Sequence, residues 1–283
     1  MIFCLLPFEP MQATASNAAV LQPIYLLTLD QQDWQIFQVN PDGTDLQKTY
    51  TSRENVTKIS YSSNNQKLLC ISNTHETFLL NLNNKEKTGI EIGMKGMVDT
   101  ALSKDDKSLL FSLSTGGSND TNHIWLADIA EKNITQLTHM KERQFDPIWS
   151  HDDLSIFFVS GDGRQNYDIW RLDIESGNLN QLTAGQLYNF EPTCSIDDEL
   201  AFSSNRSGDY EIWAMDPFGG NVRQLTHSPG MDSQPSWSPD GEQLVFVSNR
   251  DGYSALYIMN RDGSNTRRLS PEGLICRNPV WSR

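Results

Sequence analysis

The sequence is poor in cysteine and in positive charge. Its 283 residues include only 4 cysteines, which lie far apart and form no Cys-x-x-Cys pair, so the spacing predicts neither a zinc knuckle nor a disulfide. Lys and Arg together number 22, against 36 Asp and Glu, which gives a formal net charge of −14. Because binding to a nucleic-acid backbone needs clustered positive charge, this composition argues against nucleic acid as a partner.

Long apolar runs and the common catalytic motifs are also missing. No apolar run approaches the roughly 20 residues of a transmembrane helix, so we expect no membrane span. There is no Gly-x-Ser-x-Gly nucleophile elbow, no Walker loop and no Rossmann glycine set after a strand. The histidines fall at unrelated positions of the repeat described below and so predict no metal cluster; they are His75, His123, His139, His151 and His227.

The chain does contain a repeat built around Pro-x-Trp-Ser or a degenerate form of it. The anchor serines are Ser62, Ser103, Ser150, Ser195, Ser238 and Ser282, at steps of 41 to 47 residues. That period is typical of one four-stranded blade of a β-propeller. Two further marks recur in the same phase, an Ile-Trp pair as in residues 167–170 and Gln-Leu-Thr as in residues 181–183.

The repeat unit is clearest between residues 234 and 270. Its apolar, β-branched runs predict four short strands, separated by turn sequences such as Pro-Asp-Gly at 239–241 and Asn-Arg-Asp-Gly at 249–252. A four-stranded antiparallel sheet of this size cannot bury both of its faces alone. Several copies should therefore pack against one another.

The two ends of the repeat complement each other. Residues 24–39 predict strands that lack an anchor strand before them, whereas residues 278–283 are an anchor strand with no blade after it. Pairing the two would remove the free sheet edges. The sequence thus predicts an all-β fold over residues 23–283, a six-bladed β-propeller of four-stranded antiparallel blades, with the ring closed by the C-terminal strand joining the N-terminal blade. Residues 1–22 fit no blade, and we interpret them as a leader or the remnant of a secretory signal.

The candidate site lies at the mouth of the central channel. In a propeller the innermost strand of each blade lines this channel, so the residue just before the first position of each Pro-x-Trp-Ser motif should face it. The residues at these positions are Lys58, Asp99, Asp146, Glu191, Gln234 and Asn278. Phe145 and Phe190 precede two of them and are either core or an apolar patch at the same rim. We predict that these eight residues contact a binding partner.

Three of the candidates, Asp99, Asp146 and Glu191, place carboxylates at one level in consecutive blades. Carboxylate oxygens from several strands could hold Ca²⁺ or another hard cation. They could also receive a basic or N-terminal segment of a partner protein. In a third, purely structural interpretation, the channel side chains cap backbone amides of neighbouring blades. The residues alone leave these interpretations open, and we predict no other cofactor and no catalytic residue.

The best copies of the blade read Gln-Pro-Ser-Trp-Ser-Pro-Asp-Gly, Val-Ser-Asn-Arg-Asp-Gly, Ile-Met-Asn-Arg-Asp-Gly and Arg-Leu-Ser. This pattern resembles the propeller repeat of TolB, the periplasmic component of the Tol-Pal envelope system, most closely in blades four to six. The resemblance implies a non-enzymatic protein-binding scaffold of the cell envelope, located in the periplasm. It also implies that the channel mouth receives a protein partner, for which the peptidoglycan-associated lipoprotein is the model. We expect a monomer.

The resemblance has one departure and one competitor. TolB carries an α/β domain ahead of its propeller, and only about 22 residues precede the repeat in this sequence. The blade also resembles the repeat of oligogalacturonate lyases, which are propeller enzymes with channel-side His ligands for a metal. The alternative prediction is therefore a metal-assisted polysaccharide lyase or a carbohydrate-binding propeller, and the scattered histidines weigh against it.

Overall fold

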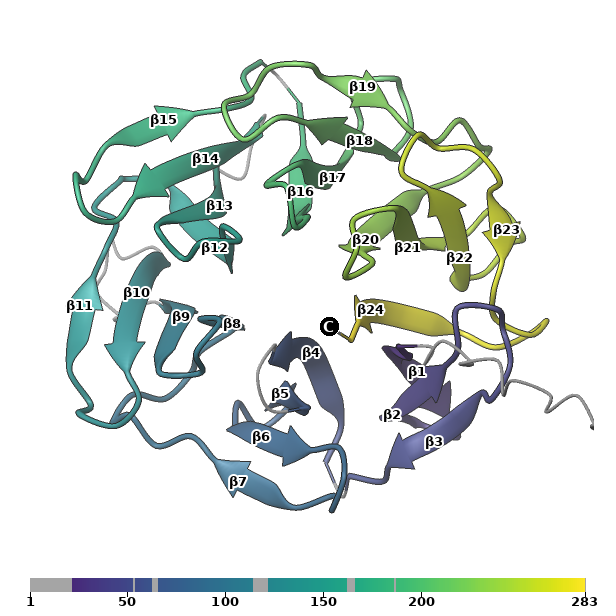
Figure 1. The fold of residues 1–283 in the computed structure, drawn as a ribbon, viewed down its shortest axis with the longest axis horizontal. Coiled ribbons are helices and arrows are strands. Elements are labelled where there is room, and N and C mark those ends of the chain that lie inside the picture. The colour runs from purple at the N-terminus through teal and green to yellow at the C-terminus, as the bar shows by residue number, and fades with distance from the viewer. Residues whose placement is uncertain are drawn as a thin grey trace, which may run out of the picture.

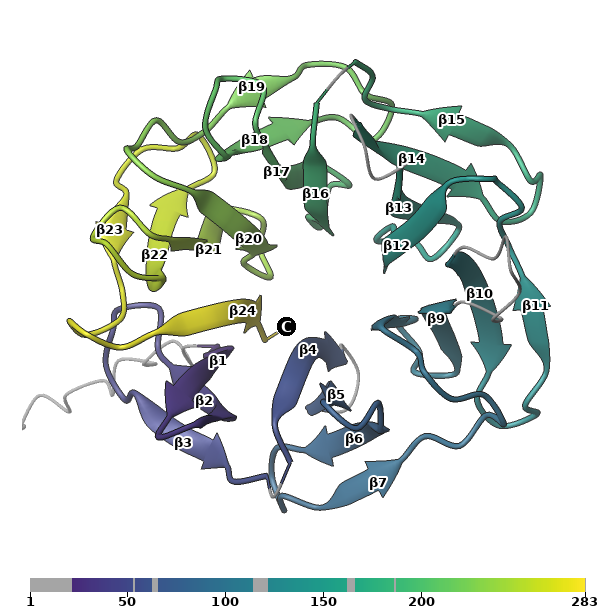
Figure 2. The same cartoon turned by 180° about the vertical axis from the view of Figure 1, so that it is seen from behind.

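The computed structural model describes residues 22–52, 54–62, 66–113, 122–161, 166–185 and 187–282. The described residues form strands, turns and connections, without a helix. Six sheets of four antiparallel strands stand in a ring around a central axis, as Figure 1 shows face-on and Figure 2 shows from behind. The predicted six-bladed propeller is therefore confirmed. The predicted leader lies outside the described residues except for Gln22.

Each blade is numbered here by its order along the chain, and its strands are given from the channel outward. Blade 1 consists of β24 (Cys276–Trp281), β1 (Ile24–Asp30), β2 (Asp33–Val39) and β3 (Gln47–Tyr50). Blade 2 consists of β4 (Val56–Ser62), β5 (Lys67–Ser72), β6 (Thr77–Asn81) and β7 (Lys87–Gly89). Blade 3 consists of β8 (Asp99–Leu102), β9 (Ser108–Leu113), β10 (His123–Asp128) and β11 (Ile134–Gln136).

The C-terminal half of the chain builds the other three blades in the same order. Blade 4 consists of β12 (Arg143–Trp149), β13 (Ser155–Gly161), β14 (Tyr167–Asp173) and β15 (Leu179–Gln181). Blade 5 consists of β16 (Asn189–Cys194), β17 (Leu200–Ser204), β18 (Glu211–Met215) and β19 (Arg223–Gln224). Blade 6 consists of β20 (Asp232–Trp237), β21 (Gln243–Ser248), β22 (Ala255–Asn260) and β23 (Arg267–Arg268).

The ring closes through the last strand. β24 pairs antiparallel with β1, with Trp281 opposite Ile24, although the two strands come from opposite ends of the sequence. The indole nitrogen of Trp281 donates to the carbonyl of Gln22 at 3.0 Å, and its backbone N–H donates to Ser236 Oγ of blade 6 at 3.1 Å. The composite first blade predicted from the repeat is therefore confirmed.

The core lies between blades rather than inside any one of them. Every residue of β13 and of β17 is buried, since each sheet packs between two neighbouring sheets and both of its faces lose solvent. Phe246 and Trp237 of blade 6, for example, belong to one cluster with Ala201 and Ile212 of blade 5. This arrangement explains why the second strand of each blade reads as a continuous apolar run instead of an alternating one.

The repeated anchor serine closes the turn between the first and second strands of a blade. Ser238 Oγ donates to Asp240 Oδ1 at 2.6 Å and accepts from the N–H of Gln243 at 2.9 Å. Ser150 Oγ donates in the same way to Asp152 Oδ1 at 2.6 Å. A hydroxyl and a carboxylate two residues apart thus satisfy turn amides that the strands leave unpaired, which gives the Ser-x-Asp spacing of the repeat its physical basis.

Candidate functional site

Four of the six channel residues stand on β-bulges of the innermost strands. The pairing register shifts next to each of these four, between Phe145 and Ile148 in β12 and at the equivalent places in β16, β20 and β24. Asp146, Glu191 and Gln234 have φ values of 49°, 54° and 54°, and Asn278 has 49°. A bulge with one residue in the left-handed region re-aims that residue's side chain, and four blades use it to bring a polar group to the channel.

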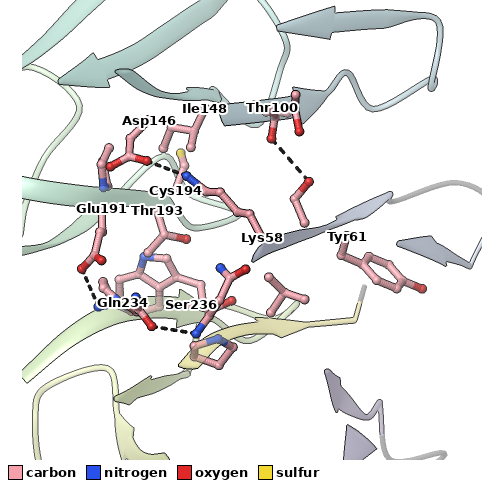
Figure 3. Close-up of a pocket in the computed structure, with 18 of the residues that line it drawn as sticks. Lys58, Tyr61, Thr100, Asp146, Ile148, Glu191, Thr193, Cys194, Gln234 and Ser236 are labelled. Carbon is pink, nitrogen blue, oxygen red and sulfur yellow. Dashed lines mark hydrogen bonds and ion pairs between the residues drawn. The ribbon is translucent and has the colours of Figure 1, made fainter. Parts of the chain in front are cut away.

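The side chains at the six channel positions form what we call the channel ring, namely Lys58, Asp99, Asp146, Glu191, Gln234 and Asn278. Half of the channel ring is an ionic cluster. The ammonium of Lys58 lies 2.6 Å from Asp99 Oδ1 and 2.6 Å from Asp146 Oδ1 (Figure 3 shows the contact with Asp146). The N–H of Asp146 also donates to Asp99 Oδ2 at 3.3 Å. The side chain of Lys58 is 33% exposed and those of the two aspartates are 16% exposed, so the cluster is mostly withdrawn from water. It links blades 2, 3 and 4.

The other half of the ring consists of side chains that cap backbone amides of the next blade. Glu191 Oε2 accepts from the N–H of Gln234 at 2.8 Å and from Ser203 Oγ at 3.0 Å. Gln234 Oε1 accepts from the N–H of Asn278 at 2.6 Å, and Asn278 Oδ1 accepts from the N–H of Ile59 at 2.5 Å. Blades 5, 6, 1 and 2 are thus joined in sequence. The structural interpretation of these side chains, as caps of neighbouring amides, is the one that these hydrogen bonds support.

The ion pairs shift the pKa values of the cluster in opposite directions. Burial disfavours the charged form of Lys58, but the carboxylates of Asp146 and Asp99 outweigh it and raise the pKa of the ammonium. Burial also opposes ionisation of Asp99, yet the adjacent ammonium keeps the pKa of that carboxyl below its usual range. Asp146 differs, since burial together with the charges of Asp99 and Glu191 outweighs Lys58 and raises its pKa to about 6.

The raised pKa of Asp146 predicts a pH-dependent contribution to stability. In the unfolded chain an aspartate titrates near about 3.9, so the folded protein binds this proton more tightly. The contribution of Asp146 is then most favourable below about pH 4 and declines as the pH rises toward about 6. We expect the free energy of unfolding of the wild type, relative to Asp146→Asn, to fall by about 2 kcal/mol over this interval. Urea unfolding of both proteins from pH 4 to 7 measures it, and a constant difference would contradict the prediction.

A cavity of about 400 Å³ extends from the ring along the inner strands. Lys58, Asp146, Glu191, Gln234 and Asn278 are among its lining residues. Aromatic and small side chains near the far ends of the same strands line the rest, including Tyr61, Trp149, Cys194, Trp237 and Trp281. Figure 3 shows Lys58, Asp146, Glu191 and Gln234 projecting from separate strands into this shared space. Five of the six predicted channel positions therefore line one cavity, and the sixth, Asp99, contacts Lys58.

The two predicted phenylalanines belong to a larger aromatic cluster. Phe145 and Phe190 lie 6.2 Å apart between ring centroids, and the ring of Tyr167 contacts both, at 5.4 Å and 5.0 Å. Tyr188 and Tyr210 join on the other side, 6.1 Å and 6.2 Å from Phe190. All five side chains are half-buried. We call them the rim cluster.

Sequence reasoning missed the tyrosines of the rim cluster, although a signal was present. Tyr167 and Tyr210 occupy the first position of the repeated mark that ends in Ile-Trp, two blades in succession. Periodicity showed that a tyrosine recurs at this position. It did not show that the tyrosine lies beside the phenylalanine that precedes each channel residue. That proximity depends on the twist of the blades and is not readable from spacing.

The structure does not present Asp99, Asp146 and Glu191 as an open cage for a metal. The Lys58 ammonium lies against two of the three carboxylates, where it provides the positive charge. Among the residues that the structure describes, no group of three or more His, Cys, Asp or Glu is arranged to hold a metal ion. Calcium binding at these carboxylates stays a prediction, for which metal analysis of the purified protein is the test.

Comparison with known proteins agrees with this architecture, and the six-bladed propeller fold is similar to that of TolB structures. Residues 197–283 match the family described as TolB beta propeller domain. TolB from Acinetobacter baumannii superposes with a TM-score of 0.79 at 23% identity, over 92% of this chain and 66% of that one. A TolB-type structure from Agrobacterium tumefaciens gives 0.73 at 20% identity, over 93% and 99%.

Two other results concern a lyase structure and the curated proteins. An oligogalacturonate lyase in complex with manganese gives a TM-score of 0.63 at 14% identity, over 88% of this chain and 74% of that one. No curated protein matches the sequence. At these identities the structural matches show the fold alone. In the described part of the chain, no helix has the length and apolar character to cross a membrane.

Proposed function

We propose that this protein is a non-enzymatic scaffold that binds another protein at its channel mouth. The observation that carries the proposal is the composition of the mouth, where three carboxylates outnumber the ammonium of Lys58 and the guanidinium of Arg277 beside five half-buried aromatic rings. Aromatic side chains with accessible faces are the groups that most often anchor protein interfaces. The surplus negative charge favours a partner with a basic surface.

The envelope setting is part of the same proposal. The match of residues 197–283 to the TolB propeller supports a partner of the cell envelope and a periplasmic location. A peptidoglycan-associated lipoprotein is the specific candidate, and we propose that the propeller binds it as a monomer. The chain spans 66% of the Acinetobacter TolB, so the partners of that whole protein reach this chain only as proposals.

The test is capture and then measurement. The propeller is immobilised as bait, the envelope fraction of the source organism is passed over it, and the retained protein is identified and purified. We expect the Asp146→Asn, Glu191→Gln double variant to bind it at least about tenfold more weakly, and with a shallower dependence on salt. Each amide keeps one oxygen acceptor and nearly the same shape, and it replaces the charged second oxygen with an NH₂ group.

A surface double variant controls for net charge. Glu175→Gln, Glu272→Gln removes two charges from exposed side chains, in the turn between β14 and β15 and in the connection between β23 and β24. It should bind the partner as the wild type does. Equal affinity and equal salt dependence in the wild type and the channel double variant would refute the role of the channel mouth.

The lyase alternative gains no support from the site. It requires histidine or carboxylate ligands converging in the channel, and the carboxylates of the ring are engaged by Lys58, Ser203 and backbone amides. The similarity to the lyase structures is limited to the fold. We therefore do not propose a catalytic function.

A further inference from the structure

One step of the channel ring differs from the other five. Hydrogen bonds or ion pairs between ring residues, or from a ring residue to an adjacent backbone amide, join blades 2 to 3, 3 to 4, 5 to 6, 6 to 1 and 1 to 2. Among the described residues no such bond joins Asp146 of blade 4 to Glu191 of blade 5. Strands β12 and β16, which carry them, are neighbours in both face views (Figures 1 and 2).

The two residues at this step are both acidic. The charge of Glu191 is one of the causes that raise the pKa of Asp146, so the two carboxylates interact unfavourably. Glu191 uses Oε2 for both of its hydrogen bonds, and Oε1 accepts none from the described residues. No Lys or Arg forms an ion pair with Glu191 in that part of the chain. Asp146 has Lys58 as its cation, whereas Glu191 has none among the described residues.

The rim cluster lies at the same step. Phe145 and Phe190 immediately precede the two acidic residues, and their rings are 6.2 Å apart across the boundary between blades 4 and 5. Tyr210 lies against Phe190, and burial together with the charges of Tyr188 and Glu191 raises the pKa of its phenol. Aromatic faces beside a carboxylate attract a cation, especially one with a flat or apolar surface.

We propose that the step between Asp146 and Glu191 receives an arginine side chain of the protein partner, whose guanidinium binds Glu191 and whose stem packs against Phe145 and Phe190. This inference rests on the proposed function, since it names the chemistry of the partner at the same channel mouth. Arginine fits better than lysine because its planar group can bind a carboxylate and stack on an aromatic ring at once.

A small molecule can probe the site without the partner. N-acetyl-arginine methylamide is the probe, and N-acetyl-citrulline methylamide, which has nearly the same shape and no charge, is its control. Both are titrated into ¹⁵N- and ¹³C-labelled protein, and the shifts of the Glu191 amide and of the Phe145 and Phe190 rings are followed by NMR. We expect the shifts to saturate with the arginine compound, and we expect the citrulline compound to bind at least tenfold more weakly.

Two variants separate the charge from the rings. Glu191→Gln keeps the oxygen that caps Gln234 and should weaken arginine binding roughly tenfold, while Phe190→Leu keeps apolar volume and should weaken it roughly fivefold. Glu175→Gln should leave it unchanged. Equal shifts with arginine and citrulline compounds, or unchanged arginine binding in Glu191→Gln, would overturn the inference.

The inference and the proposed function can fail separately. If an identified envelope partner binds Glu191→Gln and Phe190→Leu as tightly as it binds the wild type, the arginine site is wrong while the scaffold function stands. If the arginine probe binds as expected but no envelope protein is retained, the site is supported and the proposed partner class is wrong. If a partner is captured, substituting its contacting arginine should weaken its binding to the wild-type propeller. The same substitution should have no effect on binding to the Glu191→Gln variant.

Discussion

Removing β24 is expected to abolish cooperative folding of the propeller. A chain that ends after residue 275 loses the inner strand of blade 1 and exposes the edge of β1 along its pairing partners. It also loses the buried Cys276 and Trp281 from a cluster that they form with Ile24, Leu26 and Val245. Burial of one large aromatic side chain alone contributes about 3–5 kcal/mol, and total stabilities are only about 5–15 kcal/mol.

The truncated chain should therefore show no sigmoidal urea transition and should bind dyes that report exposed apolar surface. The control is a circular permutant in which residues 276–282 are joined by a turn to the front of β1. This places the inner strand ahead of the second one, as in the other blades, and it keeps every contact of β24. Cooperative unfolding of the permutant and its absence in the truncation would show that the strand itself is what the ring needs. A cooperative transition in the truncated chain would contradict the prediction.

Arg250→Met is expected to lower the free energy of unfolding by about 3–5 kcal/mol, because it leaves a buried carboxylate without its cation. Arg250 Nη2 donates to Asp232 Oδ2 at 2.8 Å, and the side chain of Asp232 is 0% exposed. The guanidinium also lies over the ring of Tyr257, 4.4 Å from its centroid. Methionine can keep the apolar contacts but not the charge.

The preceding blade supplies a matched control. Arg206 has the same place in the Ser-Asn-Arg turn of blade 5 and lies over Trp213 at 4.8 Å, but its Nη2 donates to the neutral Asn189 at 2.9 Å. Arg206→Met should therefore cost only about 1–2 kcal/mol, in the range of a lost hydrogen bond. Tryptophan fluorescence in urea at pH 7 measures both variants. Equal losses would show that the charge of Asp232 is not what makes Arg250 important.

The sequence was sufficient for the architecture because the repeat is encoded by local chemistry. Ser238 and Asp240 mark a turn whose hydrogen bonds recur in other blades, and the apolar run at 244–248 is typical of a buried strand. Counting from these marks also located the channel positions, since the channel residue precedes the anchor serine by the same number of residues in every inner strand.

The interactions at those positions were not predictable in the same way. Spacing shows that Lys58 and Asp146 occupy equivalent places two blades apart, but not that the ammonium reaches across to both aspartates. That outcome depends on the radius of the ring and on side-chain length. Likewise, the repeat placed Glu191 at the channel, whereas its bond to the N–H of Gln234 follows from a bulge with positive φ that no local pattern announced.

The hydrogen-bonded ring around the channel has a mechanical consequence. With five of its six steps bonded, it is a linear chain of blades with two ends, and the ends are Asp146 and Glu191. Every other ring residue is bonded within the ring on both sides, whereas Asp146 and Glu191 are bonded within it on one side only. Blades 4 and 5 are joined outside the ring, for example where Asn189 Nδ2 donates to the carbonyl of Tyr167 at 2.9 Å. A ligand bound between Asp146 and Glu191 would close the ring, so that displacing any one ring residue would break contacts on both of its sides.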